Sequence, residues 1–449
     1  MIGIWALLVY LVVIIVMVTA LKRNVGEAMI VGFVVAALFN GGAWLENGWA
    51  ALADALDDEI VYATVLFVIM GFLLERVGVM GRMIDLLDSL LGGLRGGPAY
   101  VSTAASAGLG SIVHNQAAIA ATVGSVTIPW MDRAKIDRTT SATIVVGNAG
   151  MGITFPFSAS MFVLVGSGAV GFTLEIDDLF LPLLAGGLWC VLHRLIVTAI
   201  LVRRSGAQAT DRENRLRFGE ALRQGWSSLL LFPAVALPML ITSGPVSALV
   251  SAHVGVEDVS DSVSVIFWLP IVLIAVGLIL GWRKLPRGVH QWSEFLQGAM
   301  PRLAIVGVTV LFAFAGANAL ATTGLPEQLS GVLDGLHLPV WLLALLIGFI
   351  VIAVAAPLSS TATMAAVGTV SVAALVAAGV PAATAATAVL VFSSCEAAVP
   401  PGGAPLYVST GIAGVDPLRT FPKMMGYYAA PLLVIGVLIA AGILPLWAV

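Results

Sequence analysis

The sequence predicts an all-α integral membrane fold, and three observations support this prediction. Of the 449 residues, 59% are hydrophobic and only 10% are charged, whereas a soluble domain carries about 25% charged residues. Long apolar stretches recur along the chain, and one region is repeated later in the sequence. The sequence has no basic arm, which argues against nucleic-acid binding. High hydrophobicity with a net charge of only −4 argues against intrinsic disorder.

Apolar stretches define the predicted membrane spans, because each spanning helix needs about 20 mostly apolar residues. The first stretch has no basic flank or cleavage site, so we expect it to be a span and not a signal peptide. The predicted spans are Ile2 to Ala20, Val25 to Ala43, Ile60 to Met80, Leu179 to Val202, Ser227 to Thr242, Val263 to Gly281, Leu303 to Ala321 and Tyr427 to Leu446.

Three short amphipathic segments are predicted to lie on the membrane surface as interfacial arms, since they are too short to cross it. They are Asp54 to Asp58, Met83 to Leu94 and Glu327 to Gly335. The one long hydrophilic stretch, Arg203 to Arg223, is predicted to connect two halves of the chain.

The basic residues orient the bundle, because Lys and Arg accumulate on the cytoplasmic side. All 21 of them face inward if regions 99–130 and 338–380 each cross the membrane only partway and return as re-entrant hairpins. Acidic residues then fill the outer loops, at Glu46 to Glu59, Glu175 to Asp178 and Glu257 to Asp261 among others. Both termini are predicted to be external.

An internal repeat appears when the sequence is shifted by 244 residues, which brings Ala118–Pro156 onto Ala362–Pro400 with 11 of 39 positions identical. The predicted orientation places the first copy's turn, Arg133 to Arg138, inside and the second copy's turn, Gly379 to Ala382, outside. The repeat is therefore predicted to be inverted. Inverted repeats with discontinuous helices are typical of secondary transporters, whose site lies where the broken segments meet.

One pair of polar breaks falls at the two predicted hairpin tips, Gly110 to Gln116 and Ala356 to Thr363. Irregular polar backbone at membrane depth must be buried in protein or line a wet cavity. We interpret these tips as sites where carbonyls and hydroxyls bind a cation and where amides meet an anionic group. The alternative is that the Ser and Thr hydroxyls only bond back onto their own helix.

A second pair of breaks interrupts the following helices, at Gly147 to Pro156 and Ser393 to Gly403. Glycines and prolines there free backbone carbonyls that suit a hard cation such as Na⁺. The alternative is a proline kink that serves packing alone.

Several ionisable residues lie within apolar segments. Glu396 is predicted to be a cation ligand or a proton carrier, and the alternative is a structural role. His114 either binds a substrate carboxylate or stays neutral with a backbone partner. Glu75-Arg76 and His193-Arg194 lie toward cytoplasmic helix ends, so we expect them to snorkel to the interface.

Enzyme motifs are absent: the sequence holds no HExxH, Walker A or GxSxG pattern, and its five histidines are scattered. Neither an enzyme nor an ATP-driven pump is predicted. Transport would be driven by an ion gradient or by a partner.

One motif runs from Gly108 to Met131 as GLGSIVHNQAAIAATVGSVTIPWM, and another from Val399 to Gly414 as VPPGGAPLYVSTGIAG. Both resemble the repeat signatures of the large membrane subunit of TRAP (tripartite ATP-independent periplasmic) transporters, in the ion-transporter superfamily. The resemblance implies an elevator-type fold in which the hairpins and the broken helices 139–171 and 383–414 form a moving transport domain. It also implies Na⁺ sites and a small organic anion, often a carboxylate, as substrate.

The predicted function is ion-gradient-driven import of such an anion across the bacterial cytoplasmic (inner) membrane by a multi-pass protein, with Na⁺ favoured and H⁺ as the other coupling ion. A stand-alone proton-coupled transporter of the same superfamily and, less favoured, a channel are the alternatives. A small membrane subunit, a periplasmic substrate-binding protein and a homo-oligomer are left open as partners.

The tips and breaks supply the predicted binding residues. Those assigned to the substrate are His114, Asn115, Gln116, Thr154, Ser360, Thr361, Pro401 and Gly402. Those assigned to Na⁺ are Ser111, Asn115, Gly147, Asn148, Gly150, Ser359, Ser360, Ser393, Ser394 and Glu396. The predicted segments are N-terminal scaffold (1–98), first transport repeat (99–171), connecting scaffold (172–337), second transport repeat (338–414) and C-terminal scaffold helix (415–449).

Overall fold

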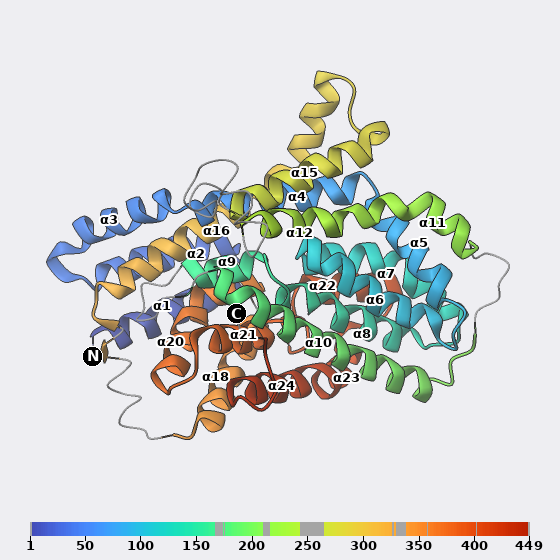
Figure 1. Cartoon of the computed structure of the whole chain (residues 1–449). Coiled ribbons are helices and arrows are strands. Elements are labelled where there is room, and N and C mark those ends of the chain that lie inside the picture. The colour runs from blue at the N-terminus through green and yellow to red at the C-terminus, as the bar shows by residue number, and fades with distance from the viewer. Residues whose placement is uncertain are drawn as a thin grey trace.

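A computed structural model describes residues 2–166, 174, 176–209, 216–242, 265–325, 327–328, 338–356, 358–400 and 402–447. The regular structure in these ranges is entirely helical, as predicted. Within the described residues, six helices are long and apolar enough to cross a membrane, or seven if one bent pair counts as a single span. The fold is therefore that of a multi-pass helical membrane protein (Figure 1).

The N-terminal helices are α1 (Ile2–Thr19), α2 (Val25–Leu38), η1 (Gly41–Ala43), α3 (Trp44–Asp57), α4 (Glu59–Arg76) and α5 (Val79–Leu91). The helices α1, α2 and α4 begin within one residue of a predicted span, but α2 ends at Leu38 instead of Ala43, and α1 and α2 are shorter than a full membrane span. The α4 helix ends earlier than predicted because Gly78 takes a positive φ of 71°, and the chain bends by 62° into α5.

The first copy of the repeat forms a helical hairpin followed by a broken helix. Its elements are α6 (Gly97–Val113), α7 (Gln116–Arg133), α8 (Arg138–Ala149), η2 (Gly150–Thr154) and α9 (Ala159–Gly166). The second copy comprises α18 (Val340–Ala355), α19 (Ser360–Thr363), the π-helical η6 (Met364–Gly368), α20 (Thr369–Ala377), α21 (Ala382–Ser393) and α22 (Ala404–Ala413).

Helix bounds reproduce the 244-residue offset independently of sequence identity. The α7 helix, Gln116–Arg133, matches the continuous helix Ser360–Ala377, and both contain 18 residues. Likewise α8 (Arg138–Ala149) matches α21 (Ala382–Ser393), each with 12 residues. The repeat is therefore structural as well as sequential.

The repeats also interlock. The α22 helix of the second copy packs against α7 and α8 of the first, while α9 of the first copy packs against α19 and η6 of the second. Each break thus directs its distal helix onto the other copy's hairpin.

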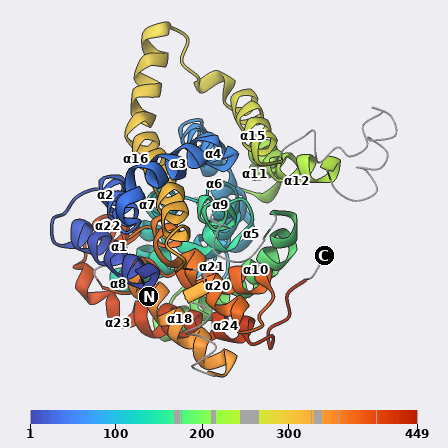
Figure 2. The same ribbon diagram turned by 90° about the vertical axis from the view of Figure 1, so that its left-hand side faces the viewer.

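The remaining helices fall into two groups. The first group comprises α11 (Phe218–Gly225), η4 (Trp226–Leu230), α12 (Leu231–Thr242), α15 (Val265–Gly281), η5 (Trp282–Lys284) and α16 (Val289–Ala321). The α16 helix packs on α2, α3 and α4 of the N-terminal region, and α15 packs on α4 and α12. Together these helices form a layer above the repeats in Figure 2.

The second group comprises α10 (Ile176–Arg204), η7 (Pro417–Arg419), α23 (Phe421–Met424), the π-helical η8 (Met425–Ala429) and α24 (Ala430–Ala440). Here α10 packs on α6 and α21, and α24 packs on α18 and α21. These helices, predicted from the sequence as scaffold helices, therefore pack against the repeats. The final helix ends at Ala440, short of the predicted Leu446, because Gly442 takes a positive φ of 71°.

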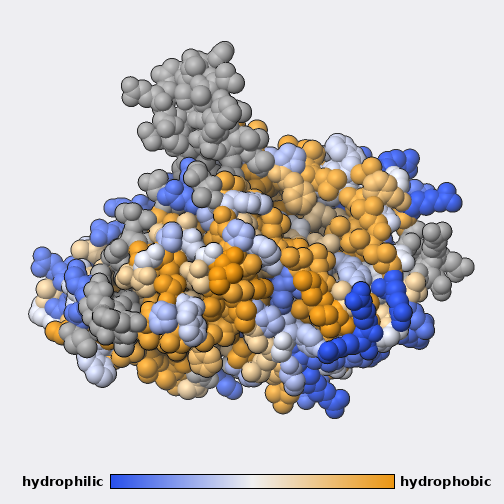
Figure 3. Space-filling model, turned by 60° about the horizontal axis from the view of Figure 1, so that its bottom comes forward, coloured by the Kyte–Doolittle hydropathy of each residue, from blue (hydrophilic) through white to orange (hydrophobic). Residues whose placement is uncertain are grey.

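The surface has the distribution expected of a membrane protein. In the face shown in Figure 3, apolar residues form a broad central band and hydrophilic residues gather toward the two ends. The predicted arm Met83 to Leu94 corresponds to most of α5, and Asp54 to Asp58 overlaps the end of the longer amphipathic helix α3. The arm Glu327 to Gly335 and the acidic loop Glu257 to Asp261 lie largely or wholly outside the described residues.

Candidate functional site

The two hairpin tips use the same local device at equivalent positions. Asn115 caps α7 by accepting a hydrogen bond from the Ala118 backbone N–H at 2.9 Å. Ser359, 244 residues later, caps α19 by accepting a hydrogen bond from the Ala362 N–H at 3.2 Å. A side-chain oxygen at this position satisfies a backbone donor that the first helical turn leaves free. Each tip is thus a defined helix start.

The tips contact each other directly. The Gln116 Nε2 atom donates a hydrogen bond to Ser360 Oγ at 2.8 Å, and both residues are buried. These residues also occupy equivalent positions in the two copies, so the contact lies where the repeats meet. This pair was predicted from each tip separately, and the structure brings the two residues together.

Glu396, from the second break, joins the same cluster. Its Oε2 atom accepts a hydrogen bond from the Ser360 backbone N–H at 2.6 Å and lies 2.8 Å from Ser360 Oγ. The Ser360 hydroxyl also lies 2.9 Å from the Ser393 carbonyl oxygen. Because Glu396 is only 6% exposed, these contacts hold a carboxyl group at the junction of tip and break.

The first break packs against its own hairpin and against the second break. A Cβ atom on Gly152 would overlap the Gly110 carbonyl, and one on Gly150 would overlap the carbonyl oxygen of Ser394. Gly150 and Ser394 are equivalent positions of the repeat. Backbone contact between the breaks therefore requires glycine at position 150.

Asn148, at the end of α8, contacts α6, the helix that leads into the first tip. Its Nδ2 atom donates a hydrogen bond to Thr103 Oγ1 at 2.9 Å, and Thr103 Oγ1 lies 2.8 Å from Thr198 Oγ1. The Asn148 Oδ1 atom is buried without a hydrogen-bond partner, as are the hydroxyls of Ser102 and Ser106 on the neighbouring α6. Asn148 and Asn115 share no hydrogen bond in the described structure, since each side chain bonds elsewhere.

Several predicted hydroxyls bond back onto their own helix, the alternative that the sequence left open. Ser111 donates to Gly108 O at 2.9 Å, Ser393 to Leu390 O at 2.9 Å and Ser394 to Val391 O at 2.7 Å. Their oxygens retain lone pairs that can accept a further contact.

A cavity of about 550 Å³ lies between the hairpin tips and the helices α4 and α16. It is lined mainly by apolar side chains, with its polar groups contributed by four residues. The lining comprises Phe67, Val68, Gly71, Phe72, Glu75, Val113, His114, Asn115, Ala117, Ala118, Ala121, Phe157, Ala159, Ile305, Val306, Thr361, Ala404 and Val408. Its volume suits a small organic molecule.

Three residues assigned to the substrate line this cavity: His114, Asn115 and Thr361. The His114 Nε2 atom lies 2.9 Å from the Pro156 carbonyl oxygen, which fixes the ring, while its buried Nδ1 atom has no partner. Thr361 Oγ1 lies 3.4 Å from Ser160 Oγ of α9.

The other residues assigned to the substrate lie outside the lining of this cavity. Gln116 and Ser360 lie in the tip contact, and Thr154 donates to Met151 O at 2.8 Å. Gly402 forms a turn with a φ of 78°, and Pro401 lies outside the described residues.

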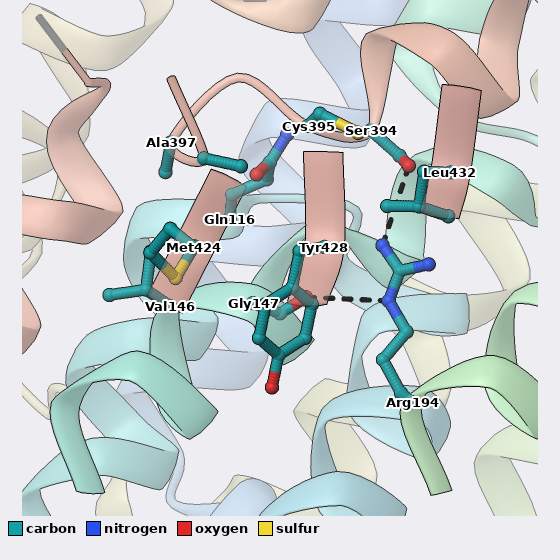
Figure 4. A pocket seen from close by; sticks show the side chains of 11 residues that line it. Gln116, Val146, Gly147, Arg194, Ser394, Cys395, Ala397, Met424, Tyr428 and Leu432 are labelled. Atoms are coloured by element: carbon teal, nitrogen blue, oxygen red, sulfur yellow. Dashed lines mark hydrogen bonds between the residues drawn. The ribbon is translucent and has the colours of Figure 1, made fainter. Parts of the chain in front are cut away.

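The expectation that Arg194 snorkels to the interface is wrong. Its side chain is fully buried and bonds the Gly147 carbonyl and the Ser394 hydroxyl, as Figure 4 shows. The reason is helix length: α10 continues for ten residues beyond Arg194 to Arg204, about 15 Å further along the axis. Glu75 also lines the cavity, whereas Arg76 is exposed as expected.

Sequence reasoning therefore missed Arg194, Glu75 and the hydroxyls of Ser102 and Ser106. A signal for the hydroxyls was present, because Ser102, Thr103 and Ser106 place three hydroxyls within five residues of an apolar run. For Arg194 the signal was the pair Arg203-Arg204, which already supplies the interfacial charges at that helix end.

Comparisons with known proteins bear on the whole chain. A family model for the DctM component of tripartite ATP-independent periplasmic transporters matches residues 4–446. An uncharacterized protein YgiK from Salmonella typhimurium is 24% identical over 297 residues, covering 66% of this chain and 63% of that protein. The C4-dicarboxylate TRAP transporter large permease protein DctM from Pseudomonas aeruginosa is 26% identical over 180 residues, covering 40% of this chain and 41% of the relative.

The chain thus aligns with less than two thirds of the length of these curated relatives. Among solved structures, the YdaH transporter of Alcanivorax borkumensis superposes with a TM-score of 0.60 at 16% identity, covering 90% of this chain and 89% of the other. This structural likeness shows a shared fold.

The family match agrees with the two motifs, the apolar helices and the absence of enzyme signatures. It identifies a transporter permease component of the bacterial inner membrane and not an enzyme. The chain belongs to the DctM family of tripartite ATP-independent periplasmic transporters.

Proposed function

We propose that the chain is the permease of a secondary transporter that imports a small organic anion of the carboxylate class, coupled to Na⁺. The observation that carries this proposal is the 550 Å³ cavity, which is shared by both hairpin tips, both distal break helices and the helices α4 and α16. A site formed jointly by two interlocked repeats and a separate helical layer suits alternating access.

Helix starts provide the positive potential for an anion. Three helix starts line the cavity: Asn115 at the start of α7, Thr361 in α19 and Ala404 at the start of α22. Free backbone N–H groups and the helix dipole favour a negative group at such ends. The lining residues include neither Lys nor Arg, so these ends and the amide of Asn115 would bind the carboxylate.

Buried oxygens on α6 and α8 would suit a hard cation. Buried side-chain oxygens without a partner are rare in proteins, and Asn148, Ser102 and Ser106 supply three on the neighbouring helices α6 and α8. These residues would hold Na⁺. The ion would contribute a positive charge, and it can bind and dissociate. Glu396, held at the junction of the second tip and break, would be a further cation ligand, or would carry H⁺ if the proton is the coupling ion.

Movement would follow the division seen in the packing. The interlocked repeats, with α10 and α24, would move as an elevator against the layer of α2, α4 and α16. A small membrane subunit and a periplasmic substrate-binding protein are proposed partners, on the strength of the tripartite family alone.

Thr361→Val tests the assignment of the cavity, because valine keeps the shape of threonine and removes the hydroxyl. We expect a several-fold higher KM for the anion with normal expression, measured as uptake by cells. Asn115→Ser, which copies the cap of the other repeat, should act in the same direction. Ser125→Ala, an exposed hydroxyl on α7, is the control. Unchanged KM in both test variants would place the substrate elsewhere.

A further inference from the structure

Arg194 is a fully buried cation that the proposed function does not use. It lies within α10, with none of its side chain exposed. An arginine remains protonated in proteins, and a buried charge requires compensating partners. The identity of those partners indicates what the residue does.

The guanidinium joins the two helix breaks. Its Nε atom donates to the Gly147 carbonyl oxygen at 3.3 Å, and its Nη2 atom donates to Ser394 Oγ at 3.4 Å. Gly147 belongs to the first break and Ser394 to the second. The two dashed contacts in Figure 4 show this bridge, with Tyr428 and Leu432 beside it.

The partners of the guanidinium are neutral oxygens. In the described part of the chain, no carboxylate lies within ion-pair distance of Arg194, and the Glu396 Oε2 atom is engaged by Ser360. The cation therefore contacts a backbone carbonyl near the end of α8 and a hydroxyl, the same ligand chemistry that discontinuous helices offer to a coupling ion.

The space around Arg194 excludes an organic anion as its ligand. Its Nη1 atom is buried without a partner, but the adjoining cavity measures only about 10 Å³. That volume is at most about that of one water molecule.

Gly147 and Ser394 consequently do not fit Na⁺, although the sequence assigned both to it. A Na⁺ ion at these oxygens would compete with the guanidinium for the same lone pairs and be repelled by its charge. We propose that Arg194 is a built-in cation that replaces one coupling ion between the two breaks. Its charge remains with the protein, so this position adds nothing to the number of ions transported; that consequence rests on the proposed Na⁺ coupling.

Purified protein allows a test that does not need transport. Arg194→Ala opens a guanidinium-sized gap between the breaks, and melting temperatures are measured in choline chloride with and without methylguanidinium chloride at equal ionic strength. We expect the variant to melt below wild type and to regain much of the loss with methylguanidinium. Wild type and Arg203→Ala, which removes an exposed charge on the same helix, should show no gain. Equal responses in all three proteins would overturn the proposal.

Ser394→Ala decides the matter if Arg194→Ala fails to fold. The proposal predicts that the Na⁺ concentration for half-maximal uptake stays at the wild-type value, because Ser394 serves the guanidinium. Ser102→Ala, from the proposed Na⁺ site, should raise it several-fold. A several-fold rise in Ser394→Ala would make that residue a Na⁺ ligand and overturn the proposal. If wild-type uptake proves independent of Na⁺, the proposed coupling ion is wrong, and the methylguanidinium response still decides the role of Arg194.

Discussion

At the residue scale, the site depends on a few close contacts between equivalent positions of the two repeats. Gln116 meets Ser360, and Gly150 meets Ser394, in each case 244 residues apart. The residues at these contacts are therefore under steric and hydrogen-bonding constraints that their own copy does not explain.

Gly150→Ala should destabilise the protein, because the added methyl group overlaps the Ser394 carbonyl oxygen and the backbone must shift. Overpacking of this kind costs about 1–3 kcal/mol. The measurement is the melting temperature of the purified variant, with Gly411→Ala as control because a Cβ there meets open space. Equal melting temperatures would show that the breaks are not in contact.

Glu396→Gln should retain the fold and lose ion coupling. The amide oxygen can still accept from the Ser360 N–H, so the 2.6 Å contact has a substitute. If Glu396 is a cation ligand, uptake by the variant should no longer depend on Na⁺ at any pH. If Glu396 is a proton carrier, uptake by the variant should no longer vary with pH. Wild-type behaviour in both respects would leave Glu396 with a structural role only.

At the scale of the elements, the turn between α7 and α8 fixes where the first broken helix begins. Asp137 caps α8 by accepting from the Thr140 N–H at 2.9 Å and lies 3.7 Å from Lys423 Nζ of α23. Partial burial by itself raises the pKa of Asp137, but the Thr140 hydroxyl and N–H together with Lys423 outweigh it and lower the pKa below its usual value. The folded state therefore favours the ionised carboxylate.

Asp137→Ala should cost about 1 kcal/mol, as for other lost helix caps, and Asp137→Asn should cost less because it keeps the cap. Since the folded pKa lies below the unfolded one, this stabilisation is present above the unfolded pKa and is lost as pH falls through the folded value. Melting temperatures of the wild type and Asp137→Asn between pH 7 and strongly acidic pH should therefore converge toward the acid end. A constant difference would contradict the role of the charge.

Sequence reasoning located the elements better than their contacts. The spans, tips and breaks follow from hydropathy, Gly and Pro alone, and even the repeat offset of 244 residues recurs in the helix bounds. The Gln116–Ser360 contact does not follow, because it depends on how two hairpins pack. The depth of Arg194 was mispredicted because it depends on where α10 ends. The π-helical turn Met364–Gly368 was also not predicted, since it has no counterpart in α7, the equivalent helix of the first copy.

At the scale of the whole molecule, the packing separates a layer of α2, α3, α4 and α16 from the interlocked repeats with α10 and α24. The cavity lies between the two parts. Relative motion of these parts would therefore expose the cavity to one side of the membrane or the other.

The predicted orientation is testable in intact cells. Cysteine introduced at Asp57, which is exposed at the end of α3, should react with an impermeant maleimide. Cysteine introduced at the exposed Gln208, beyond α10, should be protected until the cells are permeabilised. The opposite pattern would reverse the orientation of the bundle, and equal reactivity would contradict the assigned topology.

Gradient-driven uptake tests the central claim most directly. The chain would be reconstituted in liposomes with its proposed small subunit and binding protein, and a panel of labelled small organic carboxylates would be supplied outside. An inward Na⁺ gradient should drive accumulation of at least one of these anions above equilibrium, and a K⁺ gradient should not. Equilibration without accumulation would indicate a channel, and uptake that ignores Na⁺ would contradict Na⁺-coupled transport.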